Sequence, residues 1–157
     1  MNQIQKWHRD RVVILEMSEV AQTEARKGRD MRRTSKALGY SCSETLATHS
    51  EDADIFRQLE EVLFPAGAKS ASDKNDIEIA FNARKYSAIL VTDEGASKSQ
   101  PRGFLGCRAE LNELGVTVMR DFEAVAHIKE RLHTRDKAAR WRSKTFSQPL
   151  PDWVDQD

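Results

Sequence analysis

The chain has 157 residues, which is enough for one domain with a sizeable core. Its 25 lysines and arginines are balanced by 25 aspartates and glutamates, which excludes a uniformly basic coat for nucleic acid but allows local basic patches. Nothing is apolar enough over enough residues to span a bilayer, and the polar start MNQIQKWHRD is unlike a signal peptide. Cys42 and Cys107 fit no metal or redox spacing, so we expect reduced thiols in a cytoplasmic protein.

The N-terminal part of the chain is expected to contain a strand and a long helix. The apolar run at residues 12–15, VVIL, is rich in β-branched residues and predicts a buried strand. Ser18 follows and can cap a helix that begins near Glu19 and runs to about Gly39. Residues 40–50 are rich in serine and threonine and predict a loop.

Two helices are expected in the middle of the chain. Ser50, followed by two acids, predicts the start of a helix that ends before Pro65, although residues 62–64 also fit a short strand. A second helix is expected over residues 74–86, with Asp76 at the start of its inward face.

Two further strands are expected in the last third of the chain. Apolar runs at residues 88–91 and 116–119 predict strands, with a helix over residues 104–114 between them. Asp121 is expected to cap a final helix.

The alternation of strands with helices defines the expected fold class. Because the strands are continuously apolar, we expect an α/β fold, a three-layer α/β/α sandwich with a mainly parallel sheet. Residues 1–133 would form this domain, and residues 134–157 a basic, flexible C-terminal tail. Two local basic patches, at residues 26–33 and 129–144, are either solvated helix faces or anion-binding surfaces.

Four acids fall where such a fold gathers side chains, at or near the carboxyl ends of strands: Glu24, Asp76, Asp93 and Glu94. Each alone has a plain explanation, as an exposed helix residue, a first-turn acid or part of a turn. Together they predict a site for Mg²⁺ or Mn²⁺, which prefer oxygen ligands. Without a cation, such clustering would be unfavourable because like charges raise one another's pKa.

Several motifs resemble the PIN domain, a nuclease fold found in bacterial toxins and RNA-processing enzymes. WHRDRVVILEMSEVAQTE, at residues 7–24, resembles the family's second strand and following helix, where a serine ends the strand and an acid six residues later binds metal. Ser18 and Glu24 fit that spacing. NDIEIAFNA, at residues 75–83, resembles the family's Asp-x-x-Ile-x-x-Ala helix start and puts Asp76 in the metal-binding position.

The resemblance extends to the C-terminal half and covers residues 7–132. ILVTDEG resembles a strand that ends in Val-Thr-Asn-Asp, with Asp93 in place of the asparagine and Glu94 at the aspartate position. GFLGCRAELNELGVTVMRDFEAV resembles the last helix, last strand and closing helix of some members. The family's first strand, which ends in a metal-binding aspartate, has no counterpart, so we expect an N-terminally truncated member. In an alternative register, Glu16 takes the place of that aspartate.

The resemblance implies a metal-dependent endoribonuclease that hydrolyses RNA phosphodiester bonds. Glu24, Asp76 and Glu94 would bind Mg²⁺ or Mn²⁺, and Asp93 would complete the catalytic group. The resemblance implies RNA as substrate and allows a cognate antitoxin-like protein or a second copy of the chain as partner. Five basic residues are expected to hold RNA: Arg26, Lys27, Arg29, Arg33 and Arg102.

Two other functions fit the sequence less fully. A catalytically degenerate PIN-like domain would bind RNA or a protein partner without cleaving anything, and the absence of the first aspartate favours it. A flavodoxin-like or receiver-like signalling domain would also gather acids at strand ends. A receiver, however, needs an early acidic pair and a late lysine after a strand, and neither is evident in the sequence.

Overall fold

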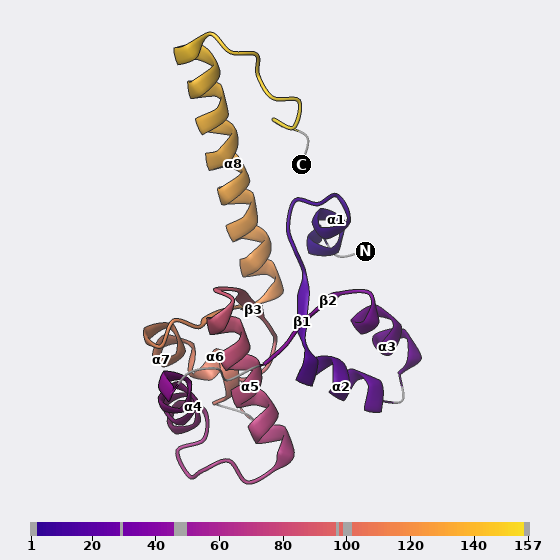
Figure 1. The fold of residues 1–157 in the computed structure, drawn as a ribbon, viewed down its shortest axis with the longest axis vertical. Helices are drawn as coiled ribbons and strands as arrows, with labels where there is room; N and C mark the ends of the chain where they lie inside the picture. The colour runs from indigo at the N-terminus through magenta and orange to yellow at the C-terminus, as the bar shows by residue number, and fades with distance from the viewer. Residues whose placement is uncertain (1–2, 29, 46–49, 97, 99–101, 156–157) are drawn as a thin grey trace. The chain divides into compact units, whose positions relative to one another are not determined.

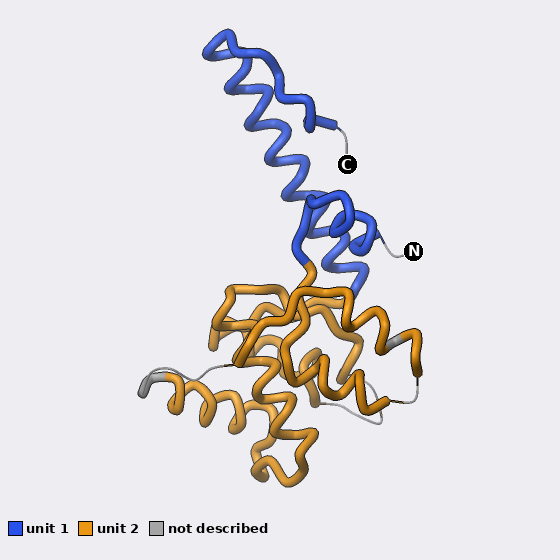
Figure 2. Tube along the Cα trace, turned by 45° about the vertical axis from the view of Figure 1, so that its right-hand side comes forward, with its two compact units in different colours: residues 1–14, 121–157 blue, residues 15–120 orange. Residues whose placement is uncertain are grey.

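The structure is a computed structural model that describes residues 3–28, 30–45, 50–96, 98 and 102–155, without the side chains of residues 33, 50 and 51. It divides the chain into two compact units (Figure 2). Unit 1 comprises residues 1–14 and 121–157, and unit 2 comprises residues 15–120. Within the described ranges, no helix combines the length and the apolar character that crossing a membrane requires.

Unit 2 is a mixed α/β structure with parallel strand pairs. The strands are β1 (Glu16–Ser18), β2 (Ser41–Ser43), β3 (Ile89–Val91) and β4 (Thr117–Met119). β1 pairs with β2 and β3 pairs with β4, both in parallel, and the two pairs form separate sheets. The predicted parallel pairing is therefore confirmed, whereas one continuous sheet is not seen in the part of the chain that the structure describes.

Helices connect the two strands of each pair, as parallel pairing requires. The connecting helices are α2 (Glu19–Lys27) and α3 (Met31–Leu38) in the first pair, and α6 (Gly103–Gly106) and α7 (Arg108–Glu113) in the second. Two predicted long helices are therefore each divided. The helix expected from Glu19 ends at Gly28, whose N–H donates to the Glu24 carbonyl. The helix expected over residues 104–114 is interrupted at Cys107.

Two long helices supply much of the core of unit 2. α4 (Ser50–Leu63) and α5 (Ala71–Lys85) form where the sequence predicts them, and α4 continues through Leu63, so the alternative short strand at residues 62–64 is wrong. The Phe56 ring stacks on Phe81, with ring centroids 4.3 Å apart. α5 begins three residues earlier than predicted because Ser70 and Asp73 form a capping box.

The prediction of a strand at residues 12–15 is wrong. A short helix, α1 (Gln3–Arg9), occupies the start of the chain, and the strand β1 begins only at Glu16. The backbone N–H groups of Val12 and Val13 both donate to the Trp7 carbonyl, at 2.8 and 3.4 Å, so they close a turn instead of joining a sheet. Ile14, expected to be buried, is 76 % exposed.

The prediction of a plain loop at residues 40–50 is also wrong, because β2 lies within it. The buried Gln22 side chain donates its amide hydrogens to the carbonyls of Ala37 and Tyr40, at 3.1 and 3.2 Å. Ser43 is buried and its hydroxyl bonds the Asn82 side chain at 2.8 Å. These polar contacts stabilise a short strand in a stretch that has too few apolar residues for a strand to be predicted from the sequence.

Unit 1 is built on one long helix, α8 (Asp121–Phe146), which begins at Asp121, the residue expected to cap it. The predicted boundary between residues 133 and 134 falls inside this helix. After Phe146 the chain returns along α8 (Figure 1), where the Asp155 N–H donates to Asp136 Oδ2 at 3.0 Å and Val154 is buried.

Candidate functional site

The first two predicted metal ligands approach each other where α2 packs on α5. Ser18 ends β1 and caps α2 by accepting a hydrogen bond from the Ala21 N–H at 3.3 Å, which sets Glu24 on the second turn of the helix. Asn75 immediately precedes Asp76 in the sequence, and its Nδ2 donates to Glu24 Oε1 at 2.7 Å. The Glu24 and Asp76 side chains are both half-buried.

The third predicted ligand, Glu94, lies just beyond the end of β3. The Thr92 N–H donates to the Met119 carbonyl at 3.0 Å and so extends the ladder with β4 by one residue. The Glu94 N–H then donates to Thr92 Oγ1 at 3.0 Å, and the Glu94 carbonyl accepts from the Leu105 N–H at 3.0 Å. The Glu94 backbone is therefore held by hydrogen bonds through both its N–H group and its carbonyl group.

Gly95 makes this turn possible. Its φ of +91° lies in the region that favours glycine, and a Cβ at this position would lie 2.2 Å from the Arg102 carbonyl oxygen. The Ala96 N–H donates to the same carbonyl at 3.3 Å. The close approach of these two backbone segments positions Glu94 relative to α6.

The negative charges of Glu24 and Glu94 both act on the Asp76 carboxyl group. Burial, followed by the negative charges of Glu94, Glu24 and Asp73, raises the pKa of Asp76 to about 7. An aspartate in water titrates near pH 3.9, so close to neutral pH about half of the Asp76 side chains carry a proton. Two acids that the sequence predicts to lie near Asp76, Glu24 and Glu94, thus oppose its ionisation in the fold.

Asp93 does not join this group to the same extent. Its side chain is 81 % exposed, and its Oδ1 lies 3.8 Å from Arg120 Nη1. An exposed pair at this distance contributes little to stability. The adjacent Glu94 is half-buried, so the pair of acids after β3 is divided between a solvent-facing and an inward-facing position.

The donor chemistry fits a divalent cation, but a complete ligand cage is not formed. In the described ranges, no group of three or more His, Cys, Asp or Glu side chains is arranged so that it could hold a metal ion. Mg²⁺ usually keeps several waters and needs only one or two carboxylates from the protein. Glu24, Asp76 and Glu94 therefore offer suitable ligands for a hydrated ion rather than a preformed cage.

The predicted RNA-binding residues have different surroundings. Arg26 and Lys27 are exposed in the last turn of α2, two and three residues after Glu24. Arg29 and the side chain of Arg33 lie outside what the structure describes. The Arg102 guanidinium donates to the Val62 carbonyl at 2.6 Å, so it ties the loop before α6 to the end of α4.

Asn75 is a residue of this site that the sequence analysis did not single out. Its contact with Glu24 joins residues 51 positions apart and depends on how α2 and α5 pack. The one signal in the sequence is its place immediately before Asp76, at the start of an inward-facing helix stripe.

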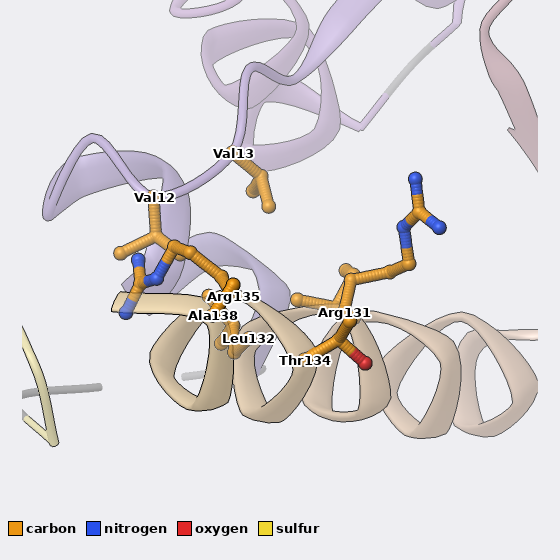
Figure 3. A pocket seen from close by; sticks show the side chains of 8 residues that line it. Val12, Val13, Arg131, Leu132, Thr134, Arg135 and Ala138 are labelled. Carbon is orange, nitrogen blue, oxygen red and sulfur yellow. The ribbon is translucent and has the colours of Figure 1, made fainter. Parts of the chain in front are cut away.

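Unit 1 contains a separate cavity of about 560 Å³ between residues 12–13 and α8 (Figure 3). Val12, Val13, Ile128 and Leu132 supply apolar lining, and polar atoms come from Arg131, Thr134 and Arg135. The apolar run that predicted a strand in the sequence thus lines a cavity on α8.

Comparisons with known protein families, with curated proteins and with solved structures found no significant match to this chain.

Proposed function

We propose that this protein is a PIN-like, metal-dependent endoribonuclease, and that its strands belong to the sheet of a three-layer α/β/α sandwich. The observation that carries the proposal is that Glu24 of α2 and Glu94 after β3 both act on Asp76 of α5, whose neighbour Asn75 donates to Glu24. These are the acids that the motif resemblance assigns to metal binding. The parallel pairing of β1 with β2 and of β3 with β4 supports the proposed topology.

Mg²⁺ or Mn²⁺ would be held by Glu24, Asp76 and Glu94, and would supply Lewis-acid polarisation of a phosphodiester. Asn75 orients Glu24 by donating to one of its oxygens, which leaves the other oxygen for a ligand. The proton that Asp76 carries near neutral pH has to leave before its carboxylate can serve as a ligand. Metal binding at this site is therefore expected to weaken as the pH falls below 7.

Basic residues near the acids supply the attraction for RNA. Arg26 and Lys27 end the helix that bears Glu24, and both are exposed. Each phosphate neutralised by such a cation adds a salt-dependent increment to the affinity. In this proposal Arg102 acts through the loop that it holds to Val62, since its guanidinium already donates to a carbonyl.

A second candidate function is a degenerate PIN-like module that binds RNA or a protein without cleavage. The observation that favours it is that the described residues form no ready-made group of three metal ligands. The two functions differ in one measurable property, because only the nuclease needs the charge of Asp76.

The experiment is cleavage of a long, unstructured single-stranded RNA in Mn²⁺, by the wild-type protein and by two matched variants. Asp76→Asn should abolish cleavage, because the amide keeps the shape but not the charge. Asp73→Asn removes the same charge one turn earlier, from a capping carboxylate, and should retain cleavage. RNA binding without cleavage by the wild type would favour the degenerate module, and cleavage by Asp76→Asn at the wild-type rate would refute the assigned site.

A further inference from the structure

The C-terminal end of α8 exposes large aromatic side chains. Trp141 is 61 % exposed and Phe146 is 60 % exposed, and their rings meet edge to face with centroids 6.1 Å apart. Exposed aromatic residues on a helix indicate a surface for binding when other features of the surface agree. The neighbouring charges provide that second feature.

Two lysines lie on the same helix face as Trp141. Lys137 and Lys144 are four residues before it and three residues after it, the spacings that share a face of an α-helix. At a rise of about 1.5 Å per residue, they flank Trp141 by about 6 Å and about 4.5 Å along the helix axis. Both lysines are exposed. Among the described residues, neither has an ion-pair partner, and the same is true of Arg142.

Two acids of unit 1, Asp136 and Asp155, are engaged in other contacts. Asp136 is buried and accepts hydrogen bonds from the Asp155 N–H at 3.0 Å and from Arg135 Nε at 2.8 Å. The Asp155 carboxylate pairs with Arg140. These contacts hold the returning C-terminal segment, and within the described ranges neither acid forms an ion pair with Lys137 or Lys144.

We propose that the Lys137–Trp141–Lys144 face binds single-stranded nucleic acid, with a base stacked on Trp141 and the lysines on the flanking phosphates. Aromatic side chains set among cations are the usual elements of such surfaces, because every base has a face that can stack. A second copy of the chain is disfavoured as occupant, since two positive faces repel. The preceding turns of this face carry Glu130, His133 and Thr134, so an apolar partner would find no continuous stripe.

This inference goes beyond the proposed function, because the face lies in unit 1 and uses none of the carboxylates of unit 2. It would hold for a chain without nuclease activity. Binding is therefore measured with the full-length protein in EDTA, where cleavage cannot contribute to the result. The probes are fluorescently labelled oligo(U) and oligo(dT), followed by anisotropy at low salt.

Trp141→Ala should weaken binding of both oligonucleotides about tenfold, within the range of about 1–3 kcal/mol for one stacked base. Trp141→Phe should restore most of the affinity. Phe122→Ala is the matched control, because Phe122 is 67 % exposed on the same helix but lies between two acids, Asp121 and Glu123. It should bind like the wild type.

The lysines are tested through the salt dependence. Lys144→Gln should reduce the slope of log affinity against log salt by about 0.7, the value for one phosphate contact on a single strand. Lys129→Gln, on the same helix but away from Trp141, should leave the slope unchanged. Preference for oligo(U) would identify RNA as the source of the ligand, and equal binding would identify single strands of either kind.

Three outcomes would overturn the proposal. They are an absence of binding by the wild type at low salt, wild-type affinity in Trp141→Ala, and an equal loss of affinity in Phe122→Ala. Sedimentation of the same variants measures the oligomeric state and so tests whether a second copy of the chain occupies the face. If Trp141→Ala dissociates a dimer without changing nucleic-acid affinity, the face binds a second copy and the proposal is wrong.

Discussion

Replacing Asp76 by asparagine should stabilise the metal-free protein above neutral pH, although the same change should abolish cleavage. The pKa of Asp76 is about 7 in the folded state, because burial and the charges of Glu94 and Glu24 oppose its ionisation. In the unfolded chain it titrates near 3.9. Between these values the folded state binds one more proton than the unfolded chain, so stability falls as the pH rises.

The size of this effect follows from the two pKa values. At 1.36 kcal/mol for each pKa unit, the rise of the Asp76 pKa on folding corresponds to a loss of stability of about 4 kcal/mol at high pH. About 3 kcal/mol of this loss occurs between pH 5 and pH 8. Asparagine cannot ionise, so the variant lacks this loss. Other carboxyl groups titrate in both proteins and cancel when the two are compared.

The assay is urea unfolding of both proteins in EDTA at pH 5 and pH 8. The free energy of unfolding of Asp76→Asn, relative to that of the wild type, should be about 3 kcal/mol higher at pH 8 than at pH 5. Parallel pH profiles for the two proteins would refute the reasoning, because they would mean that Asp76 ionises in the fold as it does in water.

Asp73→Asn is the control for removing a charge from the same helix. Hydrogen bonds from the Ser70 hydroxyl and from the Lys69 and Ser70 N–H groups lower the pKa of Asp73, so its ionised form stabilises the fold. That stabilisation is present above the unfolded pKa and is lost as the pH falls through the folded pKa. Asp73→Asn should therefore destabilise the protein at both pH 5 and pH 8, the opposite sign to Asp76→Asn at pH 8.

Three further predictions concern the surroundings of Asp76. Glu24→Gln should lower the pKa of Asp76 in an NMR titration of the side-chain carboxyl, and an unchanged value would separate the two acids in space. Excess Mn²⁺ should raise the melting temperature of the wild type at pH 8 but not that of Asp76→Asn, since an ion that binds the folded state stabilises it; equal shifts would place the ion elsewhere. Gly95→Ala should destabilise the protein by about 1–3 kcal/mol in urea unfolding, because a positive φ and the approach of the Arg102 carbonyl both oppose a Cβ; a stability equal to wild type would show that the loop adjusts freely.

The sequence predicts the elements whose determinants are local. α5 carries the predicted stripe of apolar residues, and the capping box that starts it three residues earlier than predicted is also local, since it needs only Ser70 and Asp73. Apolar runs at residues 88–91 and 116–119 predict β3 and β4 to within one residue. In each case the sequence pattern and the element that it predicts depend on residues that are close together in the sequence.

Two predictions are wrong because hydrogen bonds override the local composition, over a short range at residues 12–15 and over a long range at β2. Residues 12–15 have a strand-like composition, but α1 draws their N–H groups into a turn through the Trp7 carbonyl. β2 depends on Gln22 and Asn82, which contact it from elsewhere in the chain. In the candidate site, Glu24, Asp76 and Glu94 are indicated by their expected placement near strand ends. The role of Asn75 depends on the packing of α2 against α5, which the sequence does not reveal.

The position of Asp76 argues for a functional rather than a structural role. Its neighbour Asp73 shows what a structural carboxylate does on this helix, because it accepts three hydrogen bonds and its pKa falls. Among the residues that the structure describes, no hydrogen bond offsets the burial of Asp76 in this way, and Glu94 and Glu24 raise its pKa further. A group that destabilises its own fold at neutral pH is replaceable by asparagine without loss, unless its charge serves a ligand. A divalent cation is a ligand that would offset the negative charges of Glu24 and Glu94 around Asp76, which is why the metal-binding proposal follows from the surroundings of this carboxylate.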